Sequence, residues 1–204
     1  TAGPTYEKID PVRFIGNYSS GKMGFALAEA CAERGAEVTL VAGPVSLKTH
    51  HPAIKRIDVE SAGEMYQAAM TAFPSSDAAI LCAAVADYRP ENASEQKIKR
   101  ETEREMTLHL VPNPDIAASL GAIKREGQVM VGFALETNDE ATHAEGKLKR
   151  KNLDFIVLNS LRDQGAGFRC DTNKITIIDN AGGVTSYPLK TKREVACDLS
   201  LIHI

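Results

Sequence analysis

Short apolar runs alternate with longer segments in which apolar residues recur at helical spacing, almost from one end of the chain to the other. Runs rich in β-branched residues predict strands, and the helical spacing predicts helices. Strands are expected at 36–43, 54–61, 77–88, 106–111, 128–135 and 153–160. Helices are expected at 20–35, 62–73, 113–127 and 139–151, with a last one from about Thr191. The continuous apolar run 77–88 is typical of a central parallel strand that is buried on both faces.

The repeated order of strand, helix and strand predicts an α/β protein with a doubly wound, Rossmann-like, mostly parallel sheet. Residues 173–189 depart from this order, because two alternating strands flank "NAGG" and predict an added antiparallel hairpin. The polar stretch 89–105 is long for a connector and predicts a flexible loop, which is either a functional flap or a mobile tail on the sheet. We expect residues 1–204 to form a single domain.

Local signals mark the ends of two predicted helices. Gly35 is the expected C-cap of the first helix, and Asn113 is the expected N-cap of the helix at 113–127, with Pro114 in its first turn. In a doubly wound sheet, ligands lie beyond the carboxyl ends of the strands. The chemistry is therefore expected at residues 3–20, 83–88 and 132–136, and from Asn159 onward.

Composition narrows the classes of function. The chain has 43% hydrophobic and 25% charged residues and a net charge of -3, so no overall positive field favours nucleic acid or an anionic membrane. The four cysteines are widely spaced and predict reduced thiols. No apolar run reaches the roughly 18–20 residues of a membrane span, and no signal peptide is recognisable. These features predict a cytoplasmic location, and the start at "TAGPT" suggests a domain cut from a longer protein.

The stretch "GNYSSGKMG" (16–24) begins like a phosphate-binding P-loop but has Met23 where that motif needs a magnesium-binding hydroxyl. A standard P-loop is therefore excluded. A helix start at Ser19, Ser20, Gly21 and Lys22 would still present backbone N–H groups and a positive dipole end to an anion. The alternative is an ordinary serine-capped helix.

Two further polar stretches follow the apolar run 77–88. "AAVADYRP" (83–90) offers Asp87 directly after a strand, where it would bind a ribose hydroxyl or a substrate amide, or cap a turn. "KIKR" (97–100) lies in the polar loop, where a cation would fold over a polyphosphate or remain in solvent.

Later in the chain, "KLKRK" (147–151) places Lys147 and Lys151 on one helix face, an arrangement that is useful when an anion lies between them. "GFALET" (132–137) supplies Phe133, which would stack on a base or pack in the core. Other catalytic classes lack support, since the histidines show no metal-ligand spacing and neither G-x-S-x-G nor G-x-G-x-x-G is present.

Seven stretches together resemble phosphopantothenoylcysteine synthetase, the ligase of coenzyme A biosynthesis. They are "TAGPTYEKIDPVRFIGNYSSGKMG", "VTLVAGPVSL", "CAAVADYRP", "KIK", "VPNPDI", "GFALET" and "KLKRKNLDFIVLN", in family order and covering the chain to about residue 190. In most bacteria this enzyme is fused to a flavin-dependent decarboxylase. The resemblance implies a ligase that activates 4′-phosphopantothenate with CTP and Mg²⁺, releases pyrophosphate, and transfers the acyl group of an acyl-cytidylate to the L-cysteine amine with release of CMP. It also implies a homodimer, for which the hairpin 173–189 is a plausible interface.

The resemblance also assigns roles to residues. Asn17 matches an asparagine that contacts the acyl intermediate, Arg13 an arginine of the second half-reaction, and Lys97 a loop lysine that closes over the reactive phosphate. Nucleotide-binding positions are matched by Ala83, Asp87, Asn113, Pro114, Asp115, Ile116, Phe133, Lys147 and Lys151, and none of the matched residues is a metal ligand.

Two alternatives remain at this point: a Rossmann-type NAD(P)-dependent oxidoreductase and a nucleotide-binding module without catalysis. The first lacks an acidic residue after its second strand, where "VAGPVSL" (41–47) stands. The residues alone do not distinguish CTP from ATP, and they do not identify the groups that bind cysteine.

Overall fold

The computed structural model describes residues 1–99, 105–136, 140–160 and 170–201, which form five α-helices and thirteen strands. The helices are α1 (Lys22–Glu33), α2 (Ala62–Ala72), α3 (Ile116–Ile123), α4 (Glu140–Arg150) and α5 (Lys192–Leu199), and a short 3-10 helix follows α2 at Phe73–Ser75. Within these ranges, no helix has the length and apolar character needed to cross a bilayer.

The largest sheet has five strands in the order β12-β11-β9-β8-β5. Its members are β5 (Ala78–Leu81), β8 (Val129–Glu136), β9 (Phe155–Ser160), β11 (Ile175–Asp179) and β12 (Val184–Ser186). Strands β5, β8 and β9 are parallel, whereas β11 and β12 form the predicted antiparallel hairpin. The protein is thus α/β with a mixed sheet, and the Rossmann-like description stays a prediction.

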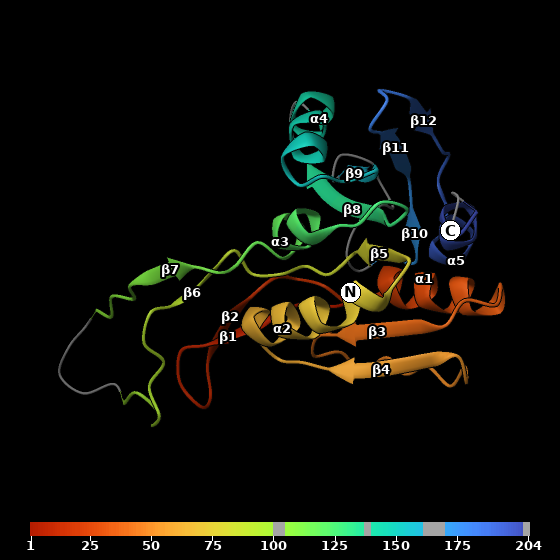
Figure 1. Ribbon diagram of the computed structural model, residues 1–204. Helices are drawn as coiled ribbons and strands as arrows, with labels where there is room; N and C mark the ends of the chain where they lie inside the picture. Colours follow the sequence, from red (N-terminus) through yellow and green to blue (C-terminus); the bar gives the residue numbers. More distant parts are fainter. Residues whose placement is uncertain (100–104, 137–139, 161–169, 202–204) are drawn as a thin grey trace.

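Four two-stranded sheets accompany this one, and β3 (Val38–Ala42) and β4 (Ile54–Asp58) lie below it while β6 (Tyr88–Pro90) and β7 (Leu110–Pro112) extend to its left (Figure 1). The pair β3 and β4 is parallel. The other pairs are antiparallel: β1 (Tyr6–Lys8) with β2 (Phe14–Gly16), β6 with β7, and β10 (Thr172–Asn173) with β13 (Lys190–Thr191). Isolated parallel bridges join Ala2 to Ala42 and Pro4 to Ala84, so the first residues of the chain lie between β3 and the end of β5.

The apolar run 77–88 was expected to be one long central strand, and this prediction is wrong. Only Ala78–Leu81 joins the five-stranded sheet, where it is half-buried and lies at the edge, and Tyr88 already belongs to β6. Beyond it the backbone bonds to the amino-terminal segment instead, through Ala83 N–H to Thr1 Oγ1 (3.2 Å) and Ala84 N–H to the Gly3 carbonyl (2.8 Å). The expected strand 106–111 is likewise short, because only its last residues belong to β7.

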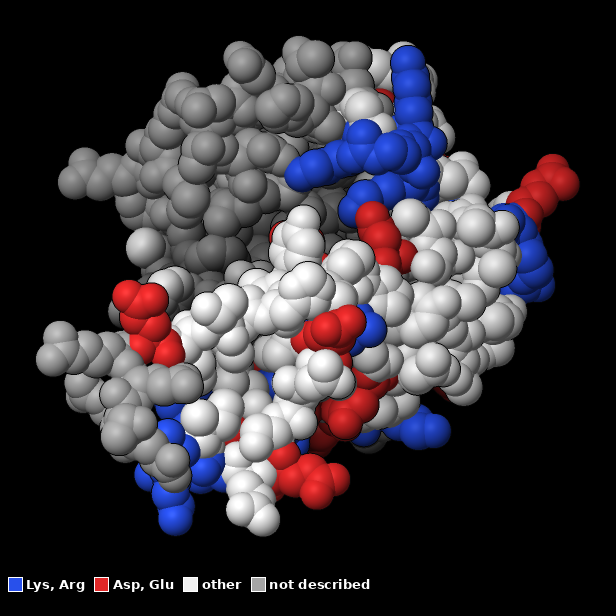
Figure 2. Space-filling view, turned by 90° about the vertical axis from the view of Figure 1, so that its left-hand side faces the viewer, with Lys and Arg blue, Asp and Glu red and all other residues white. Residues whose placement is uncertain are grey.

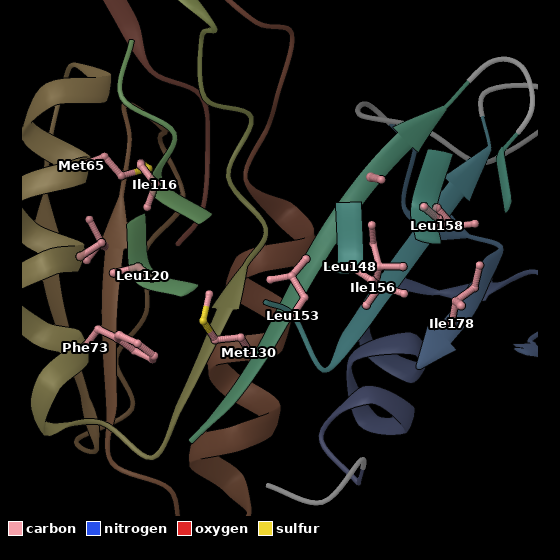
Figure 3. Packing of buried hydrophobic residues seen from close by; sticks show 14 residues of the cluster. Met65, Phe73, Ile116, Leu120, Met130, Leu148, Leu153, Ile156, Leu158 and Ile178 are labelled. Carbon is pink, nitrogen blue, oxygen red and sulfur yellow. The ribbon is translucent and has the colours of Figure 1, made fainter. Parts of the chain in front are cut away.

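Buried side chains alternate between the two faces of the main sheet, as the strand period requires. One face carries Met130, Ile156 and Ile178, which pack with α2, α3 and α4 (Figure 3). The other face carries Val131, Val157 and Ile177, which pack with α1 and α5. Helices therefore cover both faces and leave the carboxyl ends of the strands for a site.

Strands β1, β2, β6 and β7, with loop residues 9–13, 91–99 and 105–109, form an extension that we call the arm (Figure 1). Its exposed apolar side chains include Val12, Phe14, Tyr88, Met106 and Leu110. Part of the predicted flexible loop 89–105 lies here: residues 89–90 belong to β6, and residues 100–104 lie outside the described part of the chain.

Candidate active site

A cavity of about 740 Å³ lies at the carboxyl ends of β5, β8 and β9. The first turn of α1 and the amino-terminal end of α3 line it, together with Lys147 and Lys151 at the end of α4. Figure 2 shows the Lys and Arg side chains that gather near the top of one face, where the last turn of α4 is rich in basic residues. The position agrees with the rule that ligands bind beyond strand ends in α/β sheets.

The segment after β5 forms one wall of the cavity, and side chains from distant parts of the chain hold its backbone. Asn17 Nδ2 donates to the Val85 carbonyl (2.9 Å), and Asn113 Nδ2 donates to the Ala86 carbonyl (2.8 Å). The Ala86 N–H donates to Oγ1 of buried Thr5 (2.9 Å). The backbone groups of this wall are bonded to side chains instead of to a neighbouring strand. These hydrogen bonds satisfy the backbone and fix the shape of the wall.

The first turn of α1 forms a second wall. The alternative of a serine-capped helix is wrong: Gly21 is the N-cap, with a φ of 76° and no side-chain hydrogen bond to the helix. A glycine is needed there because other residues are strained at this φ. Gly24 brings α1 close to the amino-terminal segment, since a Cβ on it would lie 2.5 Å from that of Ala2. The N–H groups of this first turn have no partner within the helix and are suited to an anion.

The third wall joins α3 to α4. Asn113 was expected to cap α3 with Pro114 in its first turn, but the cap is Asp115, which accepts from the Ala118 N–H (3.0 Å). The start is later because Asn113 is engaged with the segment after β5, where its N–H donates to the Asp87 carbonyl (2.8 Å). Asp115 also pairs with Lys151 (3.0 Å).

The Asp115 carboxyl group is held in its ionised form. Partial burial acts to raise its pKa, but the hydrogen bonds from the Ala118 N–H and from Lys151 outweigh burial, and the pKa lies below its usual value. The anionic Asp115 in turn fixes the position of the Lys151 ammonium group at the cavity wall.

Most of the predicted binding residues meet at this cavity. The lining includes Asn17, Ser19, Ser20, Gly21, Lys22, Ala83, Asp87, Asn113, Pro114, Asp115, Ile116, Phe133, Lys147 and Lys151. Phe133 is half-buried and also packs against the α1–α5 core, so the packing account of this residue has support. Lys22 forms an ion pair with Asp171 (2.5 Å).

Two predicted residues lie apart from this cavity. Neither Arg13 nor Lys97 belongs to its lining; both lie on the arm. Arg13 makes a bidentate pair with buried Asp10 and also donates to the Ile98 carbonyl (2.7 Å). Their proposed catalytic roles stay predictions.

Sequence reasoning expected chemistry from Asn159 onward but gave this residue no role, and it did not single out Asn173 or Lys192, which also line the cavity. Asn159 Nδ2 donates to Asn173 Oδ1 (3.2 Å), whereas Asn159 Oδ1 is buried and has no hydrogen-bond partner. A buried unpaired acceptor in a cavity is suited to a ligand donor. A polar residue at the end of the apolar run "FIVLN" was the available signal.

Lys192 is nearly buried, and its ammonium group donates to the Cys170 carbonyl. Burial lowers its pKa, and nearby Lys22 acts in the same direction. No sequence signal could have placed it here, because the position depends on how α5 packs beside α1. Within the described ranges, no group of three or more His, Cys, Asp or Glu residues could hold a metal ion.

Comparison with known proteins identifies the family. Residues 1–202 match the DNA/pantothenate metabolism flavoprotein C-terminal domain. The chain belongs to this family. It is 49% identical over 205 residues to the coenzyme A biosynthesis bifunctional protein CoaBC of Vibrio cholerae, which covers all of this chain and 51% of that protein. It is 58% identical over 207 residues to a prokaryotic protein named cysteine/cysteine sulfinic acid decarboxylase, covering 99% of this chain and 57% of that protein.

A solved flavoprotein C-terminal domain has the same fold. The crystal structure of the C-terminal domain of a CoaBC protein is 42% identical and superposes with a TM-score of 0.80, covering 97% of this chain and 90% of the other. The chain spans about half the length of the curated relatives it matches.

Proposed function

We propose that this chain is a phosphopantothenate–cysteine ligase of coenzyme A biosynthesis. The observation that carries the proposal is the cavity at the strand ends, which is lined by lysines and by the first turn of α1. The whole of this chain is 49% identical to part of a CoaBC protein. We further propose that CTP is the activating nucleotide, so that the pantothenate carboxylate attacks its α-phosphate and pyrophosphate leaves. The cysteine amine then displaces CMP from the acyl-cytidylate.

The geometry supports the first of these steps. Two polyanions must meet, and their repulsion has to be offset by groups that are already oriented. Lys22, Lys147 and Lys151 lie around the cavity together with the N–H groups that begin α1. These groups would bind the phosphates and exclude water without reorganising. In this proposal Asn17 would hold the acyl group, and its hydrogen bond to the Val85 carbonyl at the cavity wall supports that role.

Magnesium would supply charge neutralisation on the triphosphate. The described residues fit a metal held mainly by phosphate oxygens, because the carboxylates of the lining, Asp87 and Asp115, do not form a metal-binding cluster. Asp115 is in addition engaged as a helix cap and as the partner of Lys151.

Three further features are proposals of the same kind. We propose a homodimer, a cytoplasmic location, and a native chain in which this domain is joined to a flavin-dependent decarboxylase. The last is supported by the length of the relatives, of which this chain matches about half.

Pyrophosphate release by this chain tests the function directly. With Mg²⁺, 4′-phosphopantothenate, L-cysteine and CTP, we expect pyrophosphate, CMP and an amide product in equal amounts, the last identified by mass spectrometry. Omitting cysteine should leave one burst of pyrophosphate per site, because the acyl-cytidylate stays bound. Replacement of CTP by ATP tests the nucleotide. A preparation that binds CTP but releases no pyrophosphate with the full substrate set would refute the ligase.

A further inference from the structure

The arm contains a buried carboxylate whose two oxygens bind different partners. The side chain of Asp10 has no solvent exposure. Its Oδ1 accepts from the N–H groups of Val12 (2.8 Å) and Arg13 (2.9 Å), and so closes the turn between β1 and β2. Its Oδ2 accepts from Arg13 Nε (2.9 Å), Arg13 Nη2 (2.5 Å) and the Ile98 N–H (3.2 Å).

The second set of contacts crosses between segments that are far apart in the sequence. Arg13 Nη2 also donates to the Ile98 carbonyl (2.7 Å), so both backbone groups of Ile98 are bound to the Asp10–Arg13 pair. The Ser94 N–H donates to the Ile9 carbonyl (2.9 Å) and adds a second link between the same segments. Lys97 directly precedes Ile98, so its main chain lies between two residues, Ser94 and Ile98, that are bound to the turn between β1 and β2.

Asp10 is held in its ionised form by these contacts. Burial acts to raise the pKa of Asp10, but hydrogen bonds from Arg13, Val12 and Ile98 outweigh burial, so the pKa lies well below its usual range. A buried carboxylate is tolerated only when its acceptor sites are filled. Five donors fill the acceptor sites of Asp10, which implies that the turn, Arg13 and Ile98 are ordered together.

We propose that Asp10 is a positioning residue whose buried carboxylate sets Arg13 and the main chain beside Lys97 as one unit. The functional part of this inference rests on the proposed ligase, in which these two cations act in different half-reactions. A single side chain would then fix the placement of both. Asp10 itself touches neither substrate nor nucleotide, since it is buried within the arm and does not line the cavity.

Asp10→Asn tests this placement with a small change in shape. The amide can keep its oxygen toward the turn, but its NH₂ group then faces three donors that need an acceptor. We expect trypsin to cleave after Lys97 and Lys99 about tenfold faster than in the wild type, because cleavage follows the population of opened chain. Peptide mass spectrometry identifies the bonds that are cut. An unchanged rate at these bonds would overturn the proposal.

Kinetics separate positioning from a purely structural role. With the full substrate set, Asp10→Asn should lower kcat about tenfold or more and change the KM for CTP less than about twofold, because the cavity is untouched. In an Arg13→Ala/Lys97→Ala background, Asp10→Asn should lower kcat by less than about a further twofold, since the effects of residues that act as a unit are not additive. If Asp10→Asn lowered kcat in that background as much as it does in the wild type, the proposal would be contradicted.

Two further variants keep the test interpretable. Asp58→Asn removes an aspartate–arginine contact on β4, between the exposed Asp58 Oδ1 and Arg56 Nε (2.7 Å), and should change neither cleavage nor turnover. If Asp10→Asn fails to fold by circular dichroism, Arg13→Lys replaces it: the charge is kept, but the fork that reaches Ile98 is lost, and cleavage after Lys97 should still accelerate. If the wild type makes no product, the ligase fails and the cleavage comparison alone decides the role of Asp10.

Discussion

A single amide, Asn17, connects the wall of the cavity to the proposed chemistry. Its Nδ2 donates to the Val85 carbonyl, in a part of the chain 68 residues away. Sequence resemblance assigned Asn17 to the acyl intermediate, and the structure adds that the same side chain holds the segment after β5. A substitution at this position therefore alters both the wall and the charge beside the anionic substrates.

Asn17→Asp should slow the reaction about 100-fold or more, a cost typical of losing one oriented donor. The new carboxylate would face the Val85 carbonyl oxygen and repel the phosphates. Single-turnover release of pyrophosphate measures the loss. Asn92→Asp, which adds the same charge at an exposed position of the arm, is the matched control and should retain wild-type turnover. Equal rates for the two variants would refute the role of Asn17.

Two lysines near the end of α4 provide a second comparison between neighbouring residues. Lys151 lines the cavity and pairs with Asp115, whereas Lys149 is exposed and does not line it. Lys151→Met should raise the KM for CTP about tenfold, equivalent to roughly 1.4 kcal/mol of lost binding. Lys149→Met should leave it within about twofold. Initial rates over a range of CTP concentrations measure both. Similar increases in KM for both variants would indicate that CTP responds to the overall positive charge near the end of α4 and not to a specific contact with Lys151.

Among the elements, those with strong local signals were predictable. Residues 62–73 were expected to be a helix, and α2 spans Ala62–Ala72 with a capping box between Ser61 and Glu64. The hairpin around "NAGG" is confirmed as β11 and β12. The first helix ends at Glu33, with Arg34 as its C-cap, so the expected Gly35 lies one residue further along, at a φ of 91°. Repeats of apolar residues and turn glycines encode these features locally.

Other elements depend on contacts that local sequence does not encode. The run 77–88 has the composition of a long strand, but pairing with the first residues of the chain ends β5 at Leu81. Asn113 is a good cap by type, yet its amide bonds to Ala86, and α3 begins later, at Ile116, with Asp115 as its N-cap. The end of β5 and the start of α3 both depend on contacts with distant parts of the chain. The periodicity of apolar residues carries no information about such contacts.

The junction of α3 and α4 gives a prediction for element packing. A Cβ added to Gly121 in α3 would lie 2.1 Å from the Lys151 carbonyl oxygen, which is backbone and cannot move aside freely. Gly121→Ala should therefore destabilise the protein by about 1–3 kcal/mol, although alanine is the better helix former. It should also raise the KM for CTP, because Lys151 would shift. Urea denaturation measures the stability.

Gly146→Ala in α4 is the matched control for this substitution. The nearest atom to its added Cβ is a guanidinium nitrogen of Arg150, at 4.0 Å, so the site is open. Stability should increase by about 0.5–1 kcal/mol from helix propensity alone. If Gly121→Ala proved as stabilising as Gly146→Ala, the close approach of α3 to the end of α4 would be wrong.

At the scale of the whole molecule, the site is an assembly of remote segments. Lys22 meets Asp171, and Asn173 in β10 bonds to Asn159 in β9. The net charge of -3 gave no hint of a cavity lined by lysines, because the charge of the whole chain does not show how charged residues are distributed in the fold. The resemblance to a family had already assigned most of the cavity-lining residues to one site. Lys192 and Asn173 were found there only from the packing of the structure.

The proposed homodimer leads to the last prediction. The hairpin 173–189 was the interface expected from sequence, but exposed apolar side chains are more numerous on the arm, where Leu110 is 40% exposed and Phe14 is 49% exposed. Burial of apolar surface drives most association, so we expect the arm to form the interface. Leu110→Asp should convert the dimer to a monomer in sedimentation velocity, with an unchanged circular dichroism spectrum. Val184→Asp, at a 62% exposed position of the hairpin, should remain dimeric. The opposite result would place the interface on the hairpin, and a monomeric wild type would exclude both surfaces.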